Sequence, residues 1–316
     1  MWVRVYIPGR LEGELELAPV TVLLGLPRSG KTTLLRILYD AVYYAQHRRP
    51  PRDLILLVKS VSTREEEWEL ASFRDCENCD PKLTVTCSRD GCSFTGWLNA
   101  RPLFIPTEVE LIVKYGYFPS LEPYFEFGNL VNTLRAGVYE KPSCTGGYEA
   151  VLASRPESKL VVRGGELYEV VGDVSVEIYN SSTTVAKLGL LEEVFRRGLL
   201  DEYTHILLDN PESGLHPLGQ ARLALLIHAL ANCGKRVVVA THDLIFVDML
   251  TRVEYVNKIV GADVKPADVA LYAIEDGRLK RYEAYASYIR DYTPYIYVLY
   301  GYEVEEKGED YVVFKA

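Results

Sequence analysis

Three short apolar runs divide this chain, and each is typical of a strand buried in a parallel sheet. They are Val20 to Leu24, Ile206 to Leu208 and Arg236 to Ala240. A strand covered by helices on both faces is nearly continuously apolar, whereas Met1 to Tyr6 alternates like a strand with one wet face. Thr32 to Tyr44 follows the first run and has the pattern of a helix. The patterning therefore predicts an α/β fold.

The segment between the first buried strand and its helix carries chemistry. Gly25 to Thr32 reads GLPRSGKT and fits the phosphate-binding pattern GxxxxGK[ST]. Glycines let the backbone wrap phosphates, Lys31 reaches the β and γ oxygens, and the Thr32 hydroxyl can bind Mg²⁺. Arg28 either adds a cation beside the phosphates or points to solvent. The expected nucleotide-binding residues of this segment are Gly25, Arg28, Ser29, Gly30, Lys31, Thr32 and Thr33.

The other two buried strands end in polar residues that suit the same site. Asp209 follows Ile206 to Leu208 at the carboxyl edge of the sheet, where it can hold Mg²⁺. Thr241 and His242 follow the third strand, which places His242 near the γ-phosphate. The alternatives are that Asp209 only caps its strand and that His242 is a structural histidine.

The order of these motifs resembles the ATP-binding cassette (ABC) superfamily, in its soluble SMC-like and OLD-like "AAA" branch. The family pattern runs GxxGxGK[ST], then an apolar strand with DEPExxLHP, then THS or THD. The resemblance covers residues 1–58 and about 170–275. It implies a P-loop NTPase with a mostly parallel sheet flanked by helices, and an antiparallel N-terminal edge formed by Trp2 to Ile7 and Glu14 to Leu17.

The same resemblance implies roles for individual residues. Asp209 becomes the Walker B acid, His242 the switch histidine, and Ser213 to His216 a D-loop that touches a partner subunit. Asn180 to Thr184 stands where the family has its signature motif, so that Ser181 or Ser182 reaches the γ-phosphate of a second subunit, and Ser182 is the residue assigned to the nucleotide site. Simple helix capping is the alternative. The implied activity is binding and hydrolysis of Mg·ATP, with ATP-driven closure of a head-to-tail homodimer.

One departure bears on catalysis. The family places a catalytic Glu directly after the Walker B Asp, but this chain has Asn210. General-base catalysis contributes about 10²–10⁴-fold, so its loss predicts very slow turnover. Glu212 is either a surrogate base or a structural carboxylate of the loop. The proposed catalytic set is Asp209, Glu212 and His242, and the alternative function is an ATP-gated switch that does not hydrolyse ATP.

The predicted ATPase core, residues 1–58 and 150–285, is interrupted by an insertion. Residues 59–149 are expected to form a small subdomain that can recruit a protein partner, and 286–316 a C-terminal extension packed on the core. The insertion lacks a heptad pattern, and Thr63 to Ser72 can form only a short helix. Coiled-coil arms like those of SMC proteins are therefore not expected.

Four cysteines in the insertion follow the spacing C-x2-C-x7-C-x4-C, at Cys76, Cys79, Cys87 and Cys92. Four thiolates suit structural Zn²⁺, which the sequence favours, with two disulfides or free thiols as alternatives. Cys144 and Cys233 lie outside the pattern and are expected to be single buried thiols.

Composition limits the remaining functions. The net charge of −9 does not attract nucleic acid, so a DNA-repair or defence-associated ATPase is only an alternative. The sequence has neither a membrane-spanning run nor a signal-peptide pattern at its start, which predicts a cytoplasmic protein. Glutamine occurs only at Gln46 and Gln220 beside abundant Glu, Arg and Tyr, a bias that resembles heat-adapted proteins.

Overall fold

The computed structural model describes most of the chain. The described residues are 1–47, 67–88, 90–116, 122–153 and 158–284, together with positions 54, 56 and 287 and the strands 302–307 and 310–315. The elements below are those of these residues. No helix among them is long and apolar enough to cross a bilayer.

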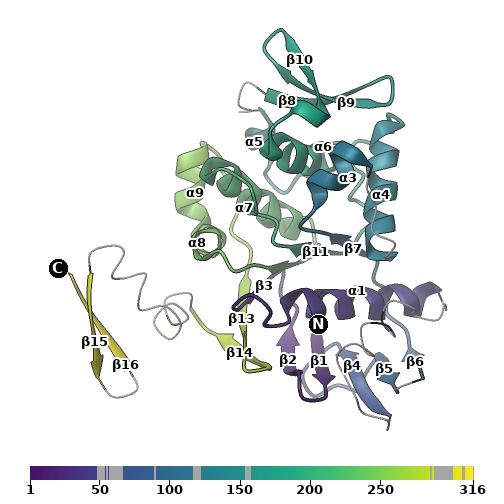
Figure 1. The fold of residues 1–316 in the computed structure, drawn as a ribbon, viewed down its shortest axis with the longest axis vertical. Coiled ribbons are helices and arrows are strands. Elements are labelled where there is room, and N and C mark those ends of the chain that lie inside the picture. The colour runs from purple at the N-terminus through teal and green to yellow at the C-terminus, as the bar shows by residue number, and fades with distance from the viewer. Residues whose placement is uncertain are drawn as a thin grey trace.

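A single large sheet organises the described residues, and the nucleotide motifs belong to its parallel part (Figure 1). The parallel strands, in spatial order, are β13 (Val269–Glu275), β3 (Val20–Leu24), β12 (Arg236–Ala240), β11 (His205–Asp209) and β7 (Pro102–Ile105). Beyond β13 the sheet continues with β14 (Arg278–Tyr282), β2 (Leu11–Glu16), β1 (Trp2–Ile7), β4 (Trp68–Arg74), β5 (Leu83–Cys87) and β6 (Cys92–Gly96). Neighbouring strands here pair in antiparallel register, except that β14 and β2 pair in parallel. The α/β fold with an antiparallel N-terminal edge is confirmed.

Apolar side chains of the central strands alternate between two cores, one on each face of the sheet. In β3, Val22 packs into one core and Leu23 into the other, and both are fully buried. The core that contains Leu23 is closed by α1 (Lys31–His47), which lies between the helical part and the antiparallel strands in Figure 1. Burial on both faces explains why these strands are continuously apolar.

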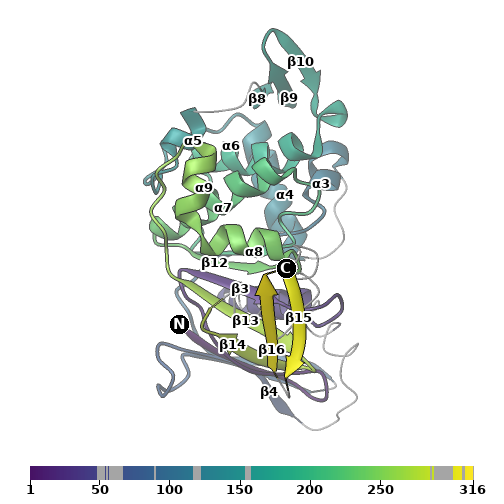
Figure 2. The same ribbon diagram turned by 90° about the vertical axis from the view of Figure 1, so that its left-hand side faces the viewer.

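Helices and a small sheet close the opposite core. Figure 2 shows α7, α8 and α9 together above β12, with β8, β9 and β10 at the far end. The elements are α3 (Val109–Tyr115), α4 (Glu122–Arg135), α5 (Glu149–Ala153), β8 (Ser158–Arg163), β9 (Glu166–Val171), β10 (Val174–Glu177), the 3₁₀ turn η1 (Ile178–Asn180), the π-helical turn η2 (Val185–Gly189), α6 (Leu190–Arg196), α7 (Pro217–Asn232), α8 (Leu244–Thr251) and α9 (Val253–Val260).

Strands of the segment 59–149 form both edges of the large sheet. Its strands β4, β5 and β6 continue the antiparallel edge through pairing of β4 with β1, and β7 pairs in parallel with β11. The strand β4 contains Trp68 to Ser72, so the short helix predicted there is wrong, and residues 61–66 lie outside the described residues. The sheet thus passes through the predicted domain boundary.

The C-terminal strands β15 (Tyr302–Lys307) and β16 (Asp310–Lys315) pair with each other in antiparallel register. The predicted packing of 286–316 on the core involves positions that, apart from 287, 302–307 and 310–315, lie outside the described residues. It stays a prediction.

All six cysteines form disulfides, which corrects two sequence-based predictions. Cys76 pairs with Cys79 and Cys87 with Cys92, so the favoured Zn²⁺ assignment gives way to the disulfide alternative. The register of the β5–β6 hairpin places Cys87 directly opposite Cys92. In the described part of the chain no group of His, Cys, Asp or Glu side chains is arranged to hold a metal ion on its own.

The third disulfide joins Cys144 to Cys233, the residue that follows α7. The prediction that these two residues are single thiols is wrong. Sequence pattern could not reveal the pair, because the cysteines are 89 residues apart and meet only when the loop before α5 reaches the end of α7. The bond therefore closes a long loop of the chain.

We predict that this long loop makes the Cys144–Cys233 bond more stabilising than the short-range pairs. Loop-closure entropy assigns about 4–5 kcal/mol to a loop of this length and about 2 kcal/mol to the Cys76–Cys79 loop. Urea unfolding of Cys144→Ser/Cys233→Ser should therefore show a larger loss of unfolding free energy than Cys76→Ser/Cys79→Ser. Equal losses in the two double variants would contradict the expectation.

Candidate functional site

The phosphate-loop residues lie at the carboxyl end of β3, in a turn that requires unusual backbone angles. Gly25 and Gly30 have φ of 143° and 107°. A Cβ on Gly25 would lie 2.7 Å from the Ser29 hydroxyl, so only glycine fits the turn. Arg28 adopts φ of 68°, a region that costs a non-glycine residue energy. The predicted loop is therefore a closed turn that leads directly into α1.

The Lys31 ammonium lies inside this turn. Its Nζ donates to the carbonyl oxygens of Gly25 at 2.7 Å and Leu26 at 2.9 Å. Burial lowers the pKa of Lys31, and the nearby charges of Asp209 and Glu212 oppose that shift. Lys31 is thus a largely buried cation held at the loop by acceptors weaker than a phosphate.

Thr32 and Asp209, the two predicted Mg²⁺ ligands, meet. The Thr32 hydroxyl lies 3.0 Å from each carboxylate oxygen of Asp209. Burial raises the pKa of Asp209, while the hydrogen bond from Thr32 opposes the rise. A hydroxyl and a carboxylate at the mouth of a phosphate loop form an oxygen donor set that suits Mg²⁺ beside a bound phosphate.

Asn210 and His242 form the wall of the site opposite the loop. The Asn210 Oδ1 and His242 Nδ1 lie 3.0 Å apart, and the Asn210 backbone N–H donates to Ala240 at the end of β12. Asn210 has φ of 40°, a left-handed conformation that Asn tolerates better than most residues. The residue in the position of the family's catalytic Glu thus faces the site with an amide.

These groups enclose one cavity of about 340 Å³. Its lining residues are Pro27, Arg28, Gly30, Lys31, Thr32, Thr33, Asn210 and His242. Most of the predicted nucleotide-binding residues therefore surround a common space. Five predicted site residues are not part of this lining: Gly25, Ser29, Asp209, Glu212 and Ser182. Ser182 lines a separate cavity beside η2 and α7.

Glu212 is buried behind the site. Its side chain is 3% exposed, Oε1 accepts a hydrogen bond from the Thr241 hydroxyl at 2.6 Å, and Oε2 has no hydrogen-bond partner among the described residues. Burial raises the pKa of Glu212 to about 7. The Glu212 carboxylate therefore contacts Thr241 and does not line the phosphate cavity. Its role as a catalytic base stays a prediction.

Sequence reasoning missed two polar side chains that support the loop after β11. The Thr107 hydroxyl donates to the backbone oxygen of Asp209 at 3.0 Å, and Lys187 donates to the carbonyl of Ser213 at 3.0 Å. Sequence reasoning did not identify Thr107 as a contact of Asp209, because it did not recognise β7 as a strand of the parallel sheet. For Lys187 a signal existed, since it is a lone lysine within the apolar stretch Val185 to Leu188.

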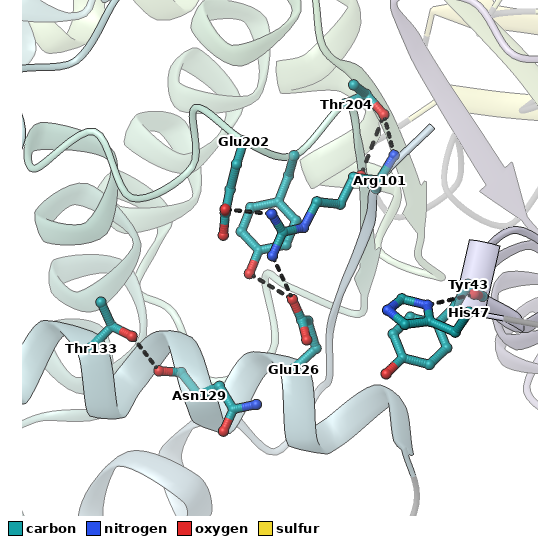
Figure 3. Close-up of polar contacts among 9 residues, drawn as sticks. Tyr43, His47, Arg101, Glu126, Asn129, Thr133, Glu202 and Thr204 are labelled. Carbon is teal, nitrogen blue, oxygen red and sulfur yellow. Dashed lines mark hydrogen bonds and ion pairs between the residues drawn. The ribbon is translucent and has the colours of Figure 1, made fainter. Parts of the chain in front are cut away.

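A second cavity, of about 610 Å³, lies at the opposite ends of β7 and β11. Figure 3 shows Arg101 between Glu202 and Glu126, with hydrogen bonds to both carboxylates. The Arg101 guanidinium also lies 5.1 Å from the centre of the Tyr203 ring. The charged groups of this cluster pair with one another and link the start of β7 to α4. We therefore assign the functional site to the carboxyl ends of the strands, where the phosphate loop lies.

The raised pKa of Glu212 predicts a pH-dependent stability. Its ordinary value is 4.5, so the folded state binds the proton more tightly and loses stability as the pH rises from 4.5 to about 7. The variant Glu212→Gln should exceed the wild type in unfolding free energy by on the order of 2 kcal/mol at about pH 8 and lose that advantage near pH 5. Urea unfolding measures the difference in unfolding free energy between Glu212→Gln and the wild type at the two pH values. A difference of the same size at both would contradict the burial argument.

Comparison with known proteins supports the fold. No family model and no curated protein matches the sequence. Among solved structures, an SMC head bound to the C-winged helix domain of ScpA is 12% identical, with a TM-score of 0.54, and the match covers 89% of this chain and 96% of that chain. The SMC head domain from Thermotoga maritima is 13% identical, with a TM-score of 0.49, and the match covers 90% of this chain and 98% of that one. The first likeness shows that this chain has the fold of an SMC head domain.

Proposed function

We propose that this protein binds Mg·ATP in the cavity between the phosphate loop and the ends of β11 and β12, and hydrolyses it slowly. The observation that carries the proposal is the contact between the Thr32 hydroxyl and both Asp209 oxygens. These groups come from residues 177 positions apart and meet beside a loop whose lysine is already in place. This arrangement supports a site in which Thr32 and Asp209 would hold Mg²⁺ and Lys31 would bind phosphate.

Each group has a distinct task in this proposal. Lys31 exchanges its carbonyl acceptors for phosphate oxygens, which are stronger acceptors for an ammonium. The N-terminus of α1 adds positive partial charge. Mg²⁺, held by Thr32 and Asp209, neutralises phosphate charge when it is bound.

Arg28 supplies further positive charge. Its backbone is held at φ of 68°, a conformation that costs of order 1–3 kcal/mol for a non-glycine residue, and it lines the phosphate cavity. The family pattern has glycine at this position, which would relieve the strain. We infer that Arg28 is placed there for its cation.

The proposed slow turnover follows from the groups that face the γ-phosphate end of the cavity. Asn210 and His242 line it, whereas the Glu212 carboxylate lies behind Thr241. An amide cannot accept the proton of the attacking water, so general-base catalysis of about 10²–10⁴-fold is missing from this arrangement. The same observation supports the second candidate function, an ATP-gated switch that does not turn over.

Dimer closure is a further part of the proposal. Ser182 is exposed and lies outside the lining of its own chain's phosphate cavity. Its hydroxyl accepts a hydrogen bond from the backbone N–H of Val185 at 3.3 Å, which helps to order the start of η2. An ordered, exposed helix start is suited to meet an anion held by a second subunit.

We predict measurable phosphate release from Mg·ATP that Lys31→Ala abolishes. Asn210→Glu should raise kcat about tenfold or more, because it restores a carboxylate beside Asp209. Glu212→Gln should leave kcat nearly unchanged, since its carboxylate does not line the cavity. A steady-state phosphate assay at elevated temperature measures all four proteins.

The outcomes of this assay separate the candidate functions. Turnover lost in Glu212→Gln would show that the loop rearranges to make Glu212 the base. ATP binding without phosphate release above the Lys31→Ala blank would establish the switch. If the wild type neither binds ATP nor releases phosphate, the proposed function is wrong.

We also predict that a non-hydrolysable ATP analogue with Mg²⁺ converts the protein to a dimer. Ser182→Arg should prevent the conversion while leaving the analogue affinity of the monomer unchanged, because Ser182 lies outside the cavity of its own chain. Ser175→Arg, at an exposed serine of β10, is the matched control and should still dimerise. Light scattering after gel filtration measures the mass, and a wild type that stays monomeric would refute dimer closure.

A further inference from the structure

A buried lysine joins the helix that follows Ser182 to the loop that follows Asp209. Lys187 lies in η2 and is 3% exposed. Its Nζ donates to the carbonyl oxygens of Ser213 at 3.0 Å and Asn210 at 3.5 Å. A buried ammonium is costly unless such acceptors surround it, so these contacts fix both the lysine and the loop.

The helix turn that carries Lys187 is itself unusual. Residues Val185–Gly189 form a π-helical turn, a rare feature that is often found at functional sites. Burial lowers the pKa of Lys187, and the neighbouring charge of Glu212 partly opposes that shift. Lys187 is thus a buried cation within an otherwise apolar stretch.

Close packing forms a second link between the same two segments. Gly214, with φ of 76°, lies so near Thr183 that an added Cβ would be 2.9 Å from the Thr183 methyl group. Gly219, in the first turns of α7, would meet the Thr184 methyl group at 3.2 Å. Segment 181–189 and the chain around 213–219 are therefore in direct contact at more than one point.

The helix α3 holds the segment 181–189 from its other side. Lys114 donates to the backbone oxygen of Ser181 at 2.8 Å, and the Thr183 hydroxyl donates to Glu110 at 3.1 Å. The segment is thus anchored to α3 through its start and to the loop 210–213 through Lys187. A continuous set of contacts therefore connects the loop 210–213 with the segment that contains Ser182.

We propose that Lys187 is a positioning residue that couples the loop 210–213 to the segment 181–189. The coupling links Asn210, at the phosphate cavity, to Ser182, on the exposed surface 28 positions earlier in the chain. This inference rests on the proposed function, because it describes how the nucleotide cavity and the proposed dimer contact are held in one arrangement. Lys187 itself does not line the phosphate cavity.

The test compares Lys187→Met with a matched control, Lys235→Met. Lys235 is also buried and donates to two backbone carbonyls, those of Asp201 and Tyr203, at the far end of β11. Lys187→Arg is the rescue variant, since a guanidinium keeps the charge and can donate to the same carbonyls. Hydrogen exchange of the backbone amides, with and without ATP analogue and Mg²⁺, is measured beside ATP affinity and kcat.

We expect Lys187→Met to accelerate exchange at residues 210–214 and 181–189 in the nucleotide-free protein, while Lys235→Met leaves both regions unchanged. ATP affinity should stay within about twofold of wild type, whereas kcat falls about tenfold or more because misplaced groups lose rate. Lys187→Arg should restore much of both properties. This split between affinity and kcat separates positioning from general destabilisation.

Three results would overturn the inference: exchange in Lys187→Met that matches the wild type in both regions, equal effects of Lys187→Met and Lys235→Met, or no rescue by Lys187→Arg. Failure of the proposed function is a different result, because it appears as a wild type that neither binds ATP nor releases phosphate. In that case exchange in the nucleotide-free protein still decides whether Lys187 couples the two segments.

Discussion

Parallel pairing of β3, β12 and β11 is the constraint on which the site depends. Because these strands are neighbours and run in one direction, their carboxyl ends meet at one edge. The phosphate loop follows β3, Asp209 ends β11, and His242 follows β12. The contact between Thr32 and Asp209 follows from this arrangement. It requires both the order of the strands and the start of α1 directly after the phosphate loop. The core on each face of the sheet fixes this edge before any ligand binds.

Burial gives the same edge its electrostatic character. Burial lowers the pKa of Lys31 and Lys187 and raises the pKa of Asp209 and Glu212, so each group is shifted toward its neutral form. The opposite charges partly offset the cost, which ties the lysines and carboxylates to one another. A phosphate and a divalent cation would enter a site that already holds both signs of charge at close range. The two buried lysines serve different loops, because Lys31 donates to the phosphate loop and Lys187 to the loop after Asp209.

The sequence predicted the elements that carry apolar runs and fixed motifs. The strands Val20–Leu24 and Arg236–Ala240 have the predicted bounds. Asp209 contacts Thr32 of the phosphate loop, and His242 lines the cavity beside that loop. The alternation from Leu83 to Thr86 is also borne out by β5. Sequence reasoning failed where the pattern is weak, at β4, β6 and β7. The Cys87–Cys92 pair depends on hairpin register, which spacing alone does not reveal. The direction of the Glu212 carboxylate was equally out of reach, because it depends on the hydrogen bond to Thr241.

The central claim is that Thr32 and Asp209 form a Mg²⁺ site for a nucleotide bound at the phosphate loop. The most direct measurement is calorimetric titration of ATP into the wild type, Thr32→Val and Asp209→Asn, each with Mg²⁺ and with excess chelator. The account predicts that Mg²⁺ tightens ATP binding to the wild type and that either substitution removes most of this gain. Binding of equal strength with and without Mg²⁺ in the wild type, or a Mg²⁺ effect that persists in both variants, would contradict it.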